Sequence, residues 1–111
     1  IRLPSVFGPK QVQDKLIPRL IRHYYSGEDC NITNDNFREY IFVDDVCDGI
    51  IENFSNSGPI TLRGIKIRNF RINELIKNIH AGEKPKGLSV EESKLWGQLK
   101  ICCEEFNKIE K

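Results

Sequence analysis

Residues 38–50 read REYIFVDDVCDGI, and this stretch decides the fold class. Its β-branched and aromatic residues predict a strand over residues 37–43. The acids that follow suit the first turn of a helix, where a carboxylate accepts hydrogen bonds from unpartnered amides. We therefore expect Asp44 or Asp45 to cap a helix that runs to about Phe54. A strand that passes directly into a helix indicates a mixed α/β fold.

The rest of the chain adds further helices and short strands. The apolar face expected for the helix after residue 45 consists of Val46, Cys47, Ile50, Ile51 and Phe54. Apolar residues at three-four spacing predict the other helices, and Gly or Pro marks their ends. The elements expected are a strand at 1–7, a helix from about 17 to 25, a brief strand at 30–33, a strand at 60–62 that Gly64 breaks, and helices over 69–82 and 89–110. The fold class is thus α/β, mixed and helix-rich.

The last part of the chain reads as one amphipathic helix. Residues 83–88 form a linker between residues 1–82 and a helix over 89–111, which Ser89 and Glu92 begin as a capping box. Its apolar stripe comprises Leu95, Leu99, Cys102, Phe106 and Ile109, with Trp96 beside it. Core packing explains such a stripe. The alternative is a non-enzymatic helical interaction module, in which Trp96 would anchor a partner.

The amino-acid composition argues against several classes of function. The chain has 111 residues, with 17 basic and 16 acidic side chains and a net charge of +1. This balance argues against nucleic-acid binding by bulk charge, and no apolar run reaches the roughly 20 residues of a membrane span. The four cysteines show no zinc-ligand spacing, so we predict no metal site and expect free thiols in a reducing cytoplasm. The apolar first residues, without a leading Met, suggest a segment of a longer protein.

Arg38 is the strongest candidate for a binding residue. A guanidinium group carries a permanent charge and a planar set of donors that suits phosphate oxygens. Held at the start of a strand, it could bind an anion, or it could pair with Glu39 or Asp35 at the surface. Asp44 and Asp45 could instead bind a metal, but together with Asp48 they lack the spacing and glycine of a calcium loop, so capping is favoured.

Three motifs together resemble a known family. RLPSVFGP (2–9), KLIP (15–18) and REYIFVDDVCDGI (38–50) resemble the carboxyl-terminal part of extended short-chain dehydrogenase/reductases, the NAD-dependent epimerase/dehydratase family, which acts mainly on nucleotide sugars. The resemblance covers about residues 1–80, and the tail resembles nothing recognisable. It implies a small substrate-binding region, with the last strand of a Rossmann sheet, from an isomerase or lyase.

The resemblance also implies roles for individual residues. Arg38 would hold the diphosphate of a nucleotide sugar, and Leu16 and Ile17 would line the nucleotide pocket. Ser5 occupies the position of the family's usual Asn, whose amide binds the substrate phosphate. A serine can still donate one hydrogen bond there.

The cofactor would be NAD(P), bound mainly by a missing amino-terminal Rossmann domain. Leu3 and Pro4 would lie beside its nicotinamide in the intact parent. The family's Gly-rich turn and Tyr-x-x-x-Lys are absent here, because Tyr24, Tyr25 and Tyr40 are each followed four positions on by an acid. The chain alone is therefore expected to bind no cofactor and to be inactive. Apolar surface that lacks its natural cover predicts a homodimer or other self-association.

Overall fold

The computed structural model describes residues 3–9, 15–32, 34–55 and 58–109. In chain order the elements are β1 (Ser5–Phe7), α1 (Leu16–Ser26), β2 (Phe37–Phe42), α2 (Val43–Glu52), β3 (Ile65–Arg68), α3 (Asn69–Ala81) and α4 (Val90–Ile109). The three strands form one sheet in the order β1-β2-β3, in which β2 pairs parallel with β1 and antiparallel with β3. The expected mixed α/β, helix-rich class is confirmed.

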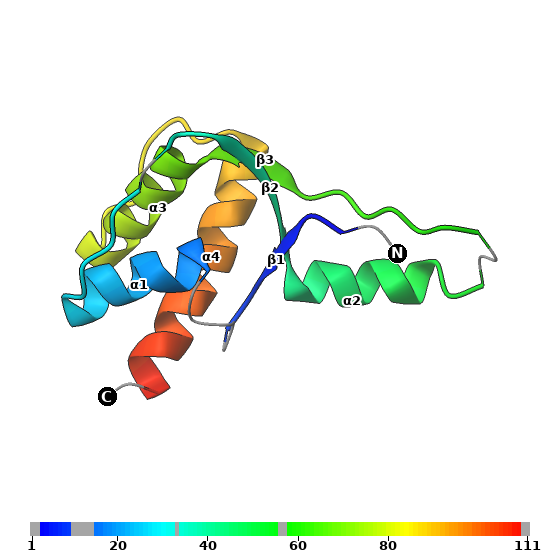
Figure 1. The fold of residues 1–111 in the computed structure, drawn as a ribbon, viewed down its shortest axis with the longest axis horizontal. Coiled ribbons are helices and arrows are strands. Elements are labelled where there is room, and N and C mark those ends of the chain that lie inside the picture. The colour runs from blue at the N-terminus through cyan, green and yellow to red at the C-terminus, as the bar shows by residue number, and fades with distance from the viewer. Residues whose placement is uncertain (1–2, 10–14, 33, 56–57, 110–111) are drawn as a thin grey trace.

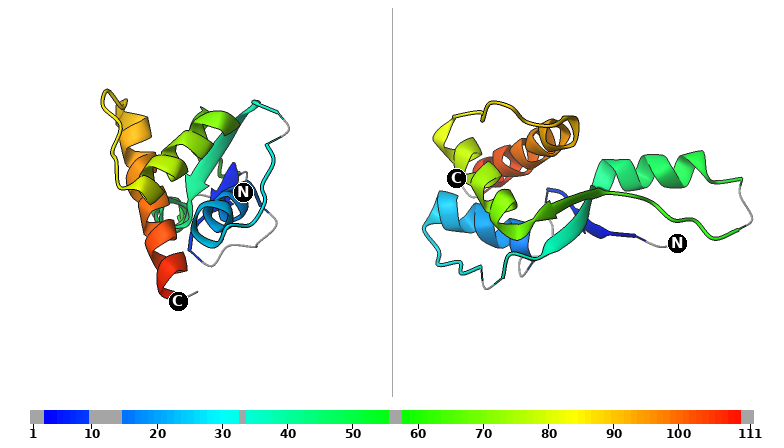
Figure 2. Two further views of the ribbon diagram at one scale, coloured as in Figure 1. Left: turned by 90° about the vertical axis from the view of Figure 1, so that its left-hand side faces the viewer. Right: turned by 90° about the horizontal axis from the view of Figure 1, so that it is seen from above.

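The helices divide into two groups around this sheet. Figure 1 shows α1, α3 and α4 together on one side and α2 on the other. Seen from above in Figure 2, α2 and the chain that returns from it extend away from the rest of the molecule. We call residues 43–55 and 58–64 the α2 arm.

The main core lies between one face of the sheet and the helices α1, α3 and α4. Phe7 packs against Tyr40 and Phe42, with ring centroids 6.3 Å and 5.3 Å apart. The buried cluster comprises Phe7, Ile17, Leu20, Ile21, Tyr40, Phe42, Ile67, Ile72, Leu75, Ile76, Leu95, Trp96, Leu99, Cys102 and Cys103. The stripe of α4 is therefore core packing as far as Cys102, with Phe106 packed against the cluster and the Ile109 side chain outside the described residues. Trp96, only 8% exposed, is not an open anchor for a partner.

The predicted ends of α1 and α3 and the predicted start of α4 are confirmed. Gly27 and Gly82 follow α1 and α3 with φ of 76°, a left-handed conformation that glycine adopts without strain. At α4, the amide of Glu92 donates to Ser89 Oγ (3.1 Å) and the amide of Ser89 donates to Glu92 Oε1 (3.4 Å). Pro18 lies in the first turn of α1, where its missing amide hydrogen costs no helical hydrogen bond.

The start of α2 differs from the prediction. Its cap is Phe42, with no side-chain hydrogen bond, and Asp44 and Asp45 lie inside the first turn. The reason is that the helix begins at the residue directly after β2, so no residue is left between them for an acidic cap. Asp45 instead accepts from Gln98 Nε2 (2.9 Å) and pairs with Lys94 Nζ (3.2 Å), which joins α2 to α4.

Two strand predictions were wrong. No strand forms at residues 30–32, where Cys30 and Ile32 pack irregularly against the core; Thr33 lies outside the described residues. The third strand follows Gly64 instead of preceding it, because Ile65 and Ile67 pair with Tyr40 and Arg38 of β2. Of residues 60–62, only Thr61 forms an isolated bridge.

Candidate functional site

The predicted site residues Ser5 and Arg38 lie on the same face of the sheet. Side chains alternate along a strand, so Arg38, Tyr40 and Phe42 project from one face of β2. Ser5 pairs in register with Tyr40 and so projects from the same face of β1. Phe42 and Tyr40 are buried under the helices, whereas Arg38 and Ser5 are exposed. This face therefore has an apolar centre and an open polar margin.

Neither of the two neighbouring acids pairs with the side chain of Arg38. Of the two carboxylates that could pair with it, Asp35 lies 3.5 Å from the guanidinium of Arg68. The other, Glu39, accepts a 2.6 Å hydrogen bond from the amide of Gly64. Within the described part of the chain, no hydrogen bond or ion pair reaches the side chain of Arg38. The structure therefore does not contain the alternative arrangement, in which Arg38 pairs with Asp35 or Glu39.

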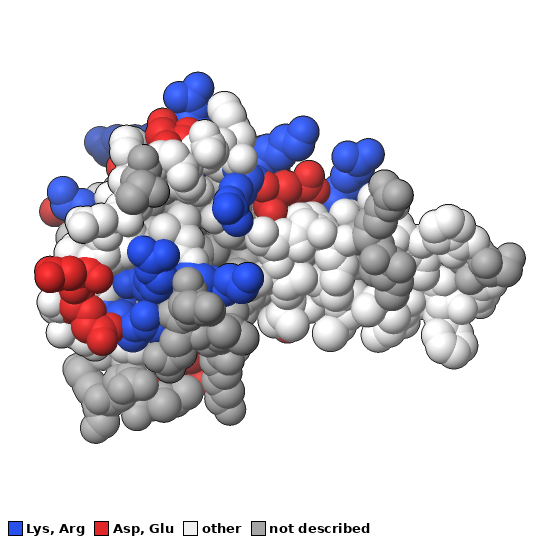
Figure 3. Space-filling model, in the orientation of Figure 1, with Lys and Arg blue, Asp and Glu red and all other residues white. Residues whose placement is uncertain are grey.

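The start of α1 provides further positive potential but little pocket surface. Its first turn contains no acid, and Lys15 stands at the cap position without a side-chain hydrogen bond. Ile17 is 2% exposed and packs within the core, whereas Leu16 is half-buried. Of these two predicted pocket residues, Leu16 is the one with surface left for a ligand. In Figure 3, basic side chains gather over α1.

The predicted cofactor-side residues lie in a different hollow. Leu3 is 45% exposed and Pro4 half-buried. They line a cavity of about 190 Å³ together with Glu39, Thr61, Leu62 and Arg63. Arg38 and Ser5 are not among the residues that line this hollow.

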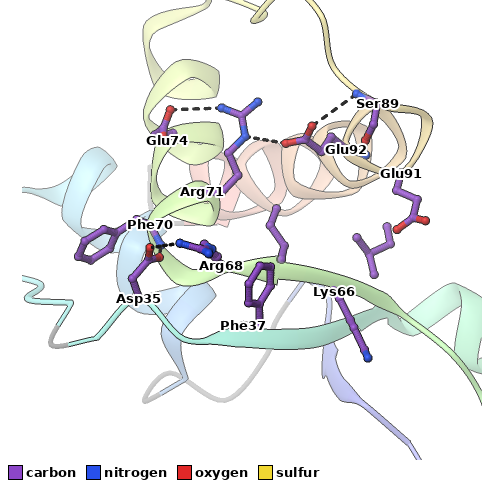
Figure 4. Close-up of a pocket in the computed structure, with 12 residues that line it drawn as sticks. Asp35, Phe37, Lys66, Arg68, Phe70, Arg71, Glu74, Ser89, Glu91 and Glu92 are labelled. Carbon is purple, nitrogen blue, oxygen red and sulfur yellow. Dashed lines mark hydrogen bonds and ion pairs between the residues drawn. The ribbon is translucent and has the colours of Figure 1, made fainter.

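A larger cavity of about 470 Å³ lies between β3 and the first turns of α3 and α4. Arg71 Nε lies 2.6 Å from Glu92 and Arg71 Nη1 lies 3.2 Å from Glu74. Figure 4 shows these pairs and Arg68 beside Asp35, whereas Lys66 points away from them. The hydrogen bond and charge of Glu92 raise the pKa of Arg71, and those of Arg71 lower the pKa of Glu92. Because these charges are paired with each other, we interpret the network as a structural link between α3 and α4.

The pKa of Glu92 makes this link sensitive to acid. Because the pKa of Glu92 is lowered in the folded state, its carboxylate stabilises the fold at pH values above the pKa of an ordinary carboxyl group. This stabilisation is lost as the pH falls through the folded-state pKa. Glu92→Gln preserves a capping side chain but removes the charge. We expect it to lower the free energy of unfolding at pH 7 by up to about 1 kcal/mol, with the difference vanishing as the pH falls below the folded-state pKa of Glu92.

Urea unfolding of both proteins at stepwise lower pH measures this difference. Glu91→Gln is the matched control, because Glu91 is exposed and forms no ion pair with another described residue. A difference between wild type and Glu92→Gln that is independent of pH would contradict the assignment.

The α2 arm carries several exposed apolar side chains close together in the sequence. Of the face expected to be buried, only Val46 is buried, whereas Cys47 and Ile50 are exposed, Ile51 is 71% exposed and Phe54 is 84% exposed. The prediction was wrong because no described element lies against this side of α2. Figure 3 shows the arm as largely uncharged on the face in view.

No group of three His, Cys, Asp or Glu side chains in the described residues is arranged to hold a metal ion. The helices in the described ranges are too short or too polar to cross a membrane.

Comparisons with known proteins give consistent results. The family model described as "NAD dependent epimerase/dehydratase family" matches residues 1–60. A dTDP-D-glucose 4,6-dehydratase from Dictyostelium discoideum is 36% identical over 47 residues, which are 40% of this chain and 11% of that protein.

Solved structures match nearly the whole chain. A dTDP-glucose 4,6-dehydratase from Bacillus anthracis in complex with NAD matches with a TM-score of 0.70 and 19% identity, over 98% of this chain and 44% of that one. MoeE5 in complex with UDP-glucose and NAD matches with a TM-score of 0.77 and 19% identity, over 99% of this chain and 47% of that one. The chain thus spans less than half the length of these relatives. The matched fold includes α4, the segment in which the sequence resembles nothing recognisable.

Proposed function

Since the chain belongs to the NAD-dependent epimerase/dehydratase family, we propose that it is the nucleotide-sugar-binding part of a longer epimerase or dehydratase. The observation that carries the proposal is the exposed Arg38, whose two potential carboxylate partners are engaged elsewhere. Ser5 on the same face and the electropositive start of α1 support it. The substrate class is a nucleoside diphosphate sugar, bound through its diphosphate.

We propose that in the longer protein NAD(P) is held mainly by residues outside this chain. The hollow at Leu3 and Pro4, about 190 Å³, is smaller than the roughly 300–1,000 Å³ of typical ligand pockets. Its lining includes no glycine-rich turn that could approach a pyrophosphate. We therefore assign no hydride-transfer step to this chain, and the expected result for it alone is no turnover. In the longer protein, Leu3 and Pro4 would border the cofactor.

Binding of nucleoside diphosphates to the 111-residue chain tests the proposal. Titration calorimetry with UDP and dTDP should give weak affinity, and UMP should bind less tightly because it lacks the second phosphate that the guanidinium would contact. Equal affinity for UDP and UMP, or no binding of UDP, would refute the proposal.

The exposed face of the α2 arm would contact the remaining polypeptide of the longer protein. Without that cover, an apolar helical face favours self-association. We expect light scattering of the chain to show a mass that rises with concentration. The double substitution Ile51→Ser and Phe54→Ser should restore a monomer, whereas Val90→Ser should not, although Val90 is 88% exposed. A monomeric wild-type chain at all concentrations would contradict this assignment.

The cysteines support a reducing compartment, and we propose the cytoplasm. All four are free thiols. Burial raises the pKa of Cys102 and of Cys103 to about 12, so both are neutral and inert and serve as core packing.

A further inference from the structure

The free edge of β3 borders the cavity of about 470 Å³ that lies beside the first turns of α3 and α4. β3 stands at one end of the sheet and, in the described part of the chain, pairs with β2 alone. All four residues from Ile65 to Arg68 line this cavity, so it runs along the whole strand. The main-chain groups of a strand point alternately to its two sides, and those of β3 that point away from β2 have no described strand to pair with.

The two faces of β3 offer different surfaces. Ile65 and Ile67 project toward the helices and are half-buried and buried, whereas Lys66 and Arg68 project from the other face and are exposed. Figure 4 shows Lys66 pointing away from the helices and Glu91 lying on the helix side. The side chains of a further strand would alternate in the same way. One set would meet apolar surface on the helix side, and the other set would meet the basic side chains.

Lys66 is the cation of this edge that lacks a carboxylate. Arg68 has one, since its guanidinium lies 3.5 Å from Asp35. Lys66 forms no ion pair with another described residue. The carboxylate of its register partner, Glu39, accepts from the amide of Gly64. An acid placed opposite Lys66 on an added strand would therefore gain a favourable cross-strand pair.

The helix side of the cavity does not suit an acid. Glu91 is exposed there and forms no ion pair with another described residue, so a second carboxylate would be repelled. The guanidinium of Arg71 is already held by Glu74 and Glu92. Apolar side chains are therefore the ones that fit on this side, against the isoleucines of β3.

A second copy of the chain is a poor occupant of this edge. In an antiparallel pair, directly opposite residues project from the same face. A copy paired antiparallel along β3 would therefore set the basic residues Lys66 and Arg68 opposite one another, and like charges in such positions are destabilising. Lysine on an edge strand is a common protection against this kind of pairing.

We propose that the edge of β3 binds an extended segment of a partner protein as a fourth strand, and that this segment alternates apolar side chains with acidic ones. The apolar side chains pack on the helix side, and the acids face Lys66 and Arg68. Main-chain hydrogen bonds provide the affinity and the alternate side chains provide the selectivity, as in other cases of strand addition. This inference does not depend on nucleotide binding.

A short fluorescent peptide in which glutamate and valine alternate tests the proposal by anisotropy titration. The wild-type chain should bind this peptide more tightly than one with lysine in place of glutamate. Lys66→Glu should reverse the preference and bind the glutamate peptide roughly ten-fold more weakly, because an unfavourable cross-strand pair replaces a favourable one. Lys84→Glu is the matched control: Lys84 is also exposed but lies outside the cavity, so the wild-type preference should remain.

A second readout separates main-chain pairing from attraction between charges alone. Alternate peptide nitrogens point to opposite sides of a strand, so only one set, either of valine or of glutamate, can face β3. Methylation of that set should abolish binding, and methylation of the other set should not. The proposal is overturned if wild type does not bind the glutamate peptide, if Lys66→Glu and Lys84→Glu lose affinity equally, or if both methylated peptides bind as well as the unmodified one.

Discussion

Gly64→Ala is expected to destabilise the chain by at least about 2–3 kcal/mol, the upper part of the range for overpacked sites. A Cβ atom at Gly64 would lie 2.2 Å from the carbonyl oxygen of Tyr40 and 2.6 Å from its carbonyl carbon. These are backbone atoms of the central strand, so they cannot rotate away as a side chain could. Because domains of this size are stable by only about 5–15 kcal/mol, the loss is a large fraction of the total.

The substitution should also disturb the margin of the proposed site. The amide of Gly64 donates to one carboxylate oxygen of Glu39, which projects from the face of β2 opposite to Arg38. Displacement of Gly64 would therefore free a carboxylate on the residue next to Arg38.

Urea unfolding with an internal control measures the stability effect. Gly97 lies in α4, and a Cβ atom added there would meet no atom within 4 Å apart from its chain neighbours and the backbone of its own helix, so Gly97→Ala should stabilise the chain by about 0.5–1 kcal/mol. Opposite signs for the two Gly→Ala substitutions are the expected result. A free energy of unfolding for Gly64→Ala within about 0.5 kcal/mol of wild type, the usual range of neutral surface changes, would contradict the close approach.

Arg38→Ala is expected to weaken UDP binding by about 1.5–3 kcal/mol, the cost of losing a hydrogen bond to a charged group. At about 1.4 kcal/mol per factor of ten, this is roughly a 10- to 150-fold loss of affinity. In the longer protein, KM for the nucleotide sugar should rise. The fold should be unaffected, because no ion pair or hydrogen bond to another described residue is lost.

Arg68→Ala is the matched control for Arg38→Ala. Arg68 is also an exposed arginine of the sheet. It pairs in register with Phe37 and therefore projects from the face of the sheet opposite to Arg38. There its guanidinium lies over the Phe37 ring and contacts Asp35. Its substitution should leave UDP affinity unchanged and cost a little stability. Equal loss of affinity in both variants would indicate general electrostatic attraction, and an unchanged affinity in Arg38→Ala would remove Arg38 from the site.

The helices could be predicted because their signals are local. The reciprocal bonds of Ser89 and Glu92 join residues three positions apart, and Gly27 and Gly82 end their helices by their own backbone freedom. The strand of residues 65–68 was missed because its alternation is short and Gly64 looked like a strand breaker. Only contact with β2, 24 positions earlier in the chain at Tyr40, shows that Gly64 permits the pairing.

By itself, the sequence determined the helix-rich α/β class, the ends of α1 and α3, the start of α4 and the residue type suited to bind a phosphate, because each depends on neighbours along the chain or on the chemistry of one side chain. Tertiary structure decided whether Arg38 is available, because Asp35 and Glu39 are engaged by Arg68 and Gly64 from a distant segment. It also decided that the apolar face of α2 is open, since burial depends on which elements pack against a helix and not on the helix's own pattern.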